Sequence, residues 1–235
     1  MDAENYPKAK EIFRRDELSD SEIENLVSFI VTQLEQVTNA DGLVIESPFV
    51  TALQNKETDI AILREMLDDT ASLNQCVKYF KKIKINANTT INSVEDTRST
   101  RDNSHVLVEQ QIDLNQRQVD TDMVERNFYY RINYFFEFSF GHSKFILANA
   151  NELIVSTVLP TDLNLKGIQS LFKMTHSLDV SLRASSCVLL ADNIKYPVGI
   201  LTIKKGLGLE ANDPEMNIII DVEVPVAFYD EGQED

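Results

Sequence analysis

Three histidines and two cysteines are the side chains of this sequence best suited to metal binding or nucleophilic catalysis. His105, His142 and His176 stand in separate segments and form neither an H-x-x-x-H nor an H-E-x-x-H pattern, so nothing predicts convergent zinc ligands. Cys76 and Cys187 are far apart, form no C-x-x-C pair and belong to no catalytic signature. The sequence therefore predicts two reduced thiols, and it predicts no catalytic residue, no metal and no cofactor.

The segment closest to a phosphate-binding loop is KKGLGLE, residues Lys204 to Glu210. A Walker loop carries its lysine after the glycines, whereas here both lysines precede them, so we predict a turn after a strand. An enzyme stays open as an alternative in which the site is gathered from residues distant in the sequence. Its pocket would collect several of Asp162, His176, Asp179, His142 and Cys187.

The chain is strongly acidic, with 22 Lys and Arg against 38 Asp and Glu and a formal net charge of −16. Basic residues form no cluster along the sequence, so we expect no direct contact with nucleic acid. The last 26 residues, from Glu210, hold nine acids and no Lys or Arg. An acidic tail at 229–235 either solvates the protein or docks onto a basic partner surface.

Residues 1–82 are predicted to form a helical region. Ser19 is followed three residues later by Glu22, a capping-box pattern, and apolar residues then recur at helical spacing as far as Val37. Short helices are expected from Pro48 and from about Asp59. Apolar spacing through Val77 and Phe80 extends the helical prediction to about residue 82.

Residues 83–235 are predicted to form a β-rich domain, because the apolar period switches from helical to two at KIKINANTTI. A mobile loop is expected at about 92–104, and segments 106–115 and 127–140 should pair as a long antiparallel hairpin. Further strands are expected to the end of the chain, with one helix interposed at LKGIQSLFKMTH, residues 165–176. The fold class is therefore α+β, with helices first and a mainly antiparallel sheet after them.

The segment RNFYYRINYFFEFSFGH packs eight aromatic residues between Phe128 and Phe140. Its even positions are all apolar, whereas its odd positions mix Tyr129 and Phe135 with polar residues, which predicts a strand with one buried face. A subunit interface and a ligand-stacking platform are the alternatives, since Tyr129 and Phe135 would lie on the mixed face. The candidate interface residues are Tyr129, Phe135, Ile219, Phe228 and Tyr229, the last three because a strand and tail near the C-terminus could reach a neighbouring subunit.

Strands rich in Asn, Thr and Asp with long polar connections, in a chain without Trp, resemble virion components of tailed phages, such as neck, tail or baseplate proteins. The resemblance implies a structural or assembly protein in a homo- or hetero-oligomeric particle. An acidic adaptor or regulator that binds a basic partner, or mimics DNA, is the alternative. No apolar run approaches the ~20 residues of a membrane span, so we expect no membrane contact and a cytoplasmic protein, or one assembled into virions in the host cytoplasm.

Overall fold

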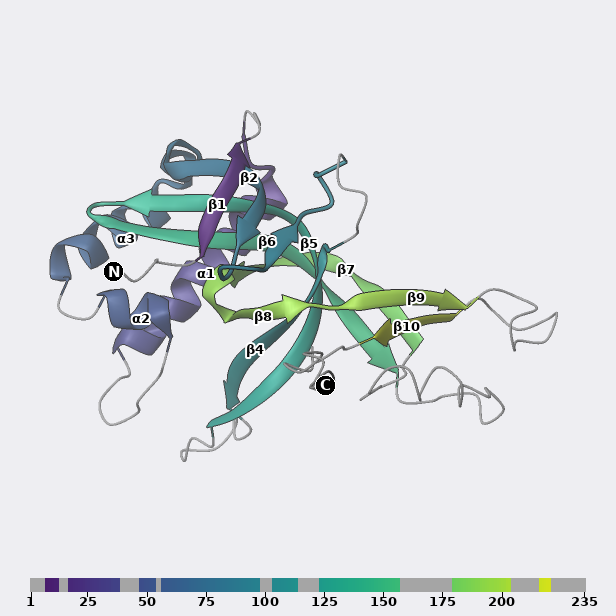
Figure 1. Cartoon of the computed structure of the whole chain (residues 1–235). Helices are drawn as coiled ribbons and strands as arrows, with labels where there is room; N and C mark the ends of the chain where they lie inside the picture. The colour runs from purple at the N-terminus through teal and green to yellow at the C-terminus, as the bar shows by residue number, and fades with distance from the viewer. Residues whose placement is uncertain are drawn as a thin grey trace, which may run out of the picture. The chain divides into compact units, whose positions relative to one another are not determined.

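The chain is α+β, as predicted, and its described residues form three α-helices near the N-terminus and a large antiparallel sheet (Figure 1). The computed structural model describes residues 7–12, 17–38, 47–53, 56–97, 103–113, 123–156, 179–203 and 216–220. The elements in chain order are β1 Lys8–Ile12, α1 Asp20–Thr38, α2 Pro48–Leu53, α3 Glu57–Asp68, the 3-10 helix η1 Thr70–Cys76, β2 Val77–Lys84, β3 Thr90–Asn92, β4 His105–Asp113, β5 Met123–Phe140, β6 Ser143–Ser156, β7 Asp179–Leu190, the 3-10 helix η2 Ala191–Asn193, β8 Ile194–Pro197, β9 Gly199–Ile203 and β10 Met216–Ile220.

Two compact units divide the chain. Unit 1 holds residues 1–153 and 182–197, and unit 2 holds residues 154–181 and 198–235. Unit 1 contains the α-helices and most of an eight-stranded sheet, whereas the described part of unit 2 includes the antiparallel pair β9–β10. Residue 82, the expected end of the helical region, lies within unit 1 in strand β2, and β1 and β2 join the first third of the chain to the sheet.

The first long helix, α1, begins as its sequence predicts. The carboxylate of Glu22 accepts hydrogen bonds from the backbone N–H and the hydroxyl of Ser19, both at 2.8 Å, and the first of these is the glutamate half of a capping box. The other carboxylate oxygen of Glu22 accepts a 2.7 Å hydrogen bond from the Tyr134 hydroxyl of β5. One side chain therefore caps the helix and joins it to the sheet.

The helical prediction is wrong for its last part, because Val77–Lys84 forms strand β2. Tyr79 and Phe80 of β2 lie opposite Phe136 and Phe135 of β5. This pairing with a distant strand outweighs the helical spacing of the segment's apolar residues. Strand β1 was not predicted at all, and it pairs antiparallel with β2.

Strand β5 is the centre of the sheet. It pairs with β2 and β4 at one edge and with β6 at the other, all antiparallel. The predicted hairpin between 106–115 and 127–140 is confirmed as β4–β5, in which nine residue pairs run from His105–Arg131 to Asp113–Met123. Strands β1 and β3 flank β2, β8 pairs with β4, and β7 pairs with β6. Pro197 ends β8, which is the last strand of the sheet beside β4, a position that suits a residue without a backbone N–H.

Two clusters of buried side chains fill unit 1, and β5 contributes to both. Core A lies between the helices and the sheet and contains Leu18, Leu26, Ile30, Leu34, Phe49, Leu53, Leu63, Met66, Leu73, Tyr79, Tyr134, Phe136, Phe138, Phe140, Phe145, Leu147, Val188 and Leu190. Core B contains Phe80, Ile83, Ile91, Val106, Val108, Tyr130, Ile132, Phe135, Ala148, Ala150, Leu189, Ala191 and Ile194. Both faces of the aromatic strand are therefore buried within the chain.

The aromatic strand does not keep a single apolar face along its length. Ile132 pairs with Ala150 but Tyr134 pairs with Asn149, so Asn133 is an extra residue that forms a β-bulge. The bulge exchanges the two faces: before it the even position Ile132 belongs to core B, and after it the odd position Phe135 belongs to core B. The prediction of one continuous even-numbered face is thus wrong, because one inserted residue reverses the alternation.

Amide side chains hold this bulge in place. Asn133 Nδ2 donates to Asn149 Oδ1 and to Asn151 Oδ1 of β6, each at 2.7 Å. Asn151 Nδ2 in turn donates to the Arg183 backbone carbonyl of β7 at 3.0 Å. Asn25 Nδ2 of α1 donates to Ser186 Oγ at 3.1 Å. The polar residue within the aromatic run is therefore a structural clamp between strands.

The turn between β5 and β6 is anchored to α3. Gly141 takes φ +53°, and a Cβ there would lie 2.9 Å from Asp59 Cγ, which leaves no room for a side chain. Ser143 Oγ donates to Asp59 Oδ2 at 2.6 Å, and the backbone N–H of His142 donates to Asp59 Oδ1 at 3.4 Å. The pKa of Asp59 is lowered, mainly by the hydrogen bond from Ser143, although burial of the carboxyl group acts to raise it.

Some predictions fall beyond the described residues. The interposed helix at 165–176 and the tail at 229–235 lie outside them, as does part of the loop predicted at 92–104. The described part of that loop is hydrogen-bonded to the sheet, since Ser93 N–H donates to the Lys81 carbonyl at 2.8 Å and Val94 N–H to the Ile132 carbonyl at 3.0 Å. None of the helices in the described ranges has the length and apolar character needed to cross a bilayer.

Candidate interaction surface

The described part of unit 1 contains a cleft of about 540 Å³ between α1, the start of α2, strands β4 and β5, and the β7–β8 connection. Most of its lining side chains are polar. They are Thr32, Gln33, Ser47, Glu109, Gln110, Gln111, Glu125, Asp192, Asn193 and Lys195, with Phe29, Pro48, Val188, Leu189 and Leu190 at the apolar part.

Partners within the cleft satisfy several of these polar groups. Ser47 Oγ donates to Gln33 Oε1 at 2.9 Å, and Lys195 forms an ion pair with Glu109. Desolvation raises the pKa of Asp192. The lining includes no His or Cys, so its groups offer hydrogen bonding and charge rather than a nucleophile with a neighbouring base.

Of the residues proposed for a dispersed enzyme site, neither His142 nor Cys187 lines this cleft. His142 is exposed in the β5–β6 turn, Cys187 is half-buried in β7, and Asp179 begins β7. Burial raises the pKa of the Cys187 thiol to about 11, which keeps it protonated and weakly nucleophilic at neutral pH. Asp162 and His176 lie outside the described residues.

The candidate interface residues that the structure describes are buried in their own chain. Phe135 is fully buried in core B, and Tyr129 is 7% exposed. Ile219 of β10 is buried opposite Ile200 of β9. Phe228 and Tyr229 fall outside the described residues. The described interface candidates therefore present little surface to a partner.

A different surface, which the sequence did not reveal, is formed where β1 pairs with β2. In this register Lys8 lies directly opposite Lys84, and Lys10 directly opposite Lys82. Residues opposite each other in an antiparallel pair share a face, as do residues two apart on one strand. Ala9 and Ile83, between them, pack with core B, as does Phe80, which lies two residues before Lys82 and opposite Ile12. We call Lys8, Lys10, Lys82 and Lys84 the lysine face.

Placing like charges directly opposite each other destabilises a strand pair. Asp96 offsets part of this charge, since its carboxylate lies 3.3 Å from Lys82 Nζ and its side chain is 1% exposed. Lys8 and Lys10 are exposed on β1, whereas Lys82 and Lys84 are half-buried. The lysine face is a concentration of positive charge in a chain whose net charge is −16.

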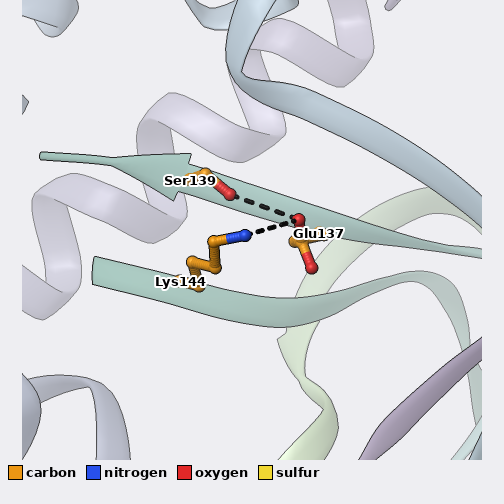
Figure 2. Close-up of polar contacts among 3 residues, drawn as sticks. All are labelled: Glu137, Ser139 and Lys144. Atoms are coloured by element: carbon orange, nitrogen blue, oxygen red, sulfur yellow. Dashed lines mark hydrogen bonds and ion pairs between the residues drawn. The ribbon is translucent and has the colours of Figure 1, made fainter. Parts of the chain in front are cut away.

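A lysine on the β5–β6 hairpin has a different setting (Figure 2). Lys144 Nζ lies 3.5 Å from the Glu137 carboxylate, and Ser139 Oγ donates to the same oxygen at 3.5 Å. Lys78 of β2 also lies opposite Glu137 in the register. Here lysines alternate with a carboxylate, whereas on the lysine face they oppose one another.

Within the described ranges, no group of three His, Cys, Asp or Glu side chains is arranged to hold a metal ion. Comparisons of the chain with protein-family models, with curated proteins and with solved structures found no match.

Proposed function

We propose that this protein is a non-catalytic structural or assembly protein that acts through protein–protein contacts in a multi-subunit particle. Particles of the kind found in the neck, tail or baseplate of tailed phages are the proposed setting. The observation that carries the proposal is the lysine face, where the register of β1 and β2 sets four lysines against one another.

The charge distribution supports contact between subunits. Surfaces of opposite sign steer two proteins together and fix their relative orientation. A protein with net charge −16 that concentrates lysines on one sheet face has an uneven charge distribution, so its copies can associate in a defined direction.

Self-association is the test. Sedimentation velocity and multi-angle light scattering, from low to high micromolar protein at physiological salt, should show reversible growth beyond the monomer. A protein that stays strictly monomeric over this range contradicts assembly from copies of this chain.

A further inference from the structure

We draw no further inference here: the strongest candidate, the polar cleft between α1, the start of α2, the β4–β5 hairpin and the β7–β8 connection, offers only a cluster of acidic side chains in a chain that is acidic throughout, and nothing in the described residues shows what ligand or partner would occupy it.

Discussion

Replacing Asn133 with alanine removes the side chain that joins the bulge of β5 to β6. Its Nδ2 donates to Asn149 Oδ1 and Asn151 Oδ1, each at 2.7 Å. Asn149 is 3% exposed, so water cannot replace the donor, and an unsatisfied buried acceptor costs about 1–3 kcal/mol. Asn151 is half-buried and water can reach it, so that hydrogen bond contributes about 0.5–1.5 kcal/mol. Together the free energy of unfolding should fall by about 1.5–4.5 kcal/mol.

Urea denaturation followed by far-ultraviolet circular dichroism measures this loss, since the chain has no Trp to report by fluorescence. Asn127→Ala is the matched control: Asn127 is exposed on the same strand, opposite Glu109, so its removal should change stability by less than about 0.5 kcal/mol. In thermal melting the Asn133 variant should lose about 5–15 °C. A loss no larger than that of the control would refute the role given to the amide clamp.

Three further changes test other parts of the structure. Phe136→Asp should unfold unit 1, because it places a carboxylate in core A where Phe136 is 1% exposed; a soluble variant with unchanged melting would contradict the core assignment. Gly141→Ala should lower the free energy of unfolding by about 1–2 kcal/mol, because φ is positive and the new Cβ meets the Asp59 carboxylate, and an unchanged urea midpoint would count against this. Asp59→Asn should destabilise the protein at neutral pH. Because the folded pKa of Asp59 is lowered, its contribution is present above the unfolded value of 3.8 and is lost as pH falls through the folded pKa. The unfolding free energies of wild type and variant should therefore converge in acid, and a difference that persists there would show that charge is not the cause.

Local sequence signals predicted the parts of the fold that depend on neighbours in the chain. The Ser19–Glu22 pattern marks the start of α1, and the hydrogen bond from the Ser19 backbone N–H to the Glu22 carboxylate is present. The alternating segments around 106–115 and 127–140 identified the β4–β5 hairpin, whose two strands are close in sequence. In these cases the residues that decide the structure are near one another along the chain.

The remaining features depend on pairing between distant residues. Val77 and Phe80 have helical spacing, but they pair with Phe138 and Phe135 of β5. The bulge at Asn133 is marked in the sequence by a polar amide within an aromatic run. Unless the position of the bulge is known, the strand faces on which Tyr129 and Phe135 lie cannot be assigned. The lysine face was missed because only the β1–β2 register brings residues 8 and 10 to residues 84 and 82.

Sharing one strand between two cores has a consequence for how unit 1 unfolds. Strand β5 supplies Phe136 and Phe138 to core A and Ile132 and Phe135 to core B, within seven consecutive residues. Displacing β5 therefore exposes apolar side chains of both cores at once, so neither core stays packed while the other unfolds. Two clusters that could have melted separately are coupled into one cooperative transition, in which helix loss and sheet loss coincide.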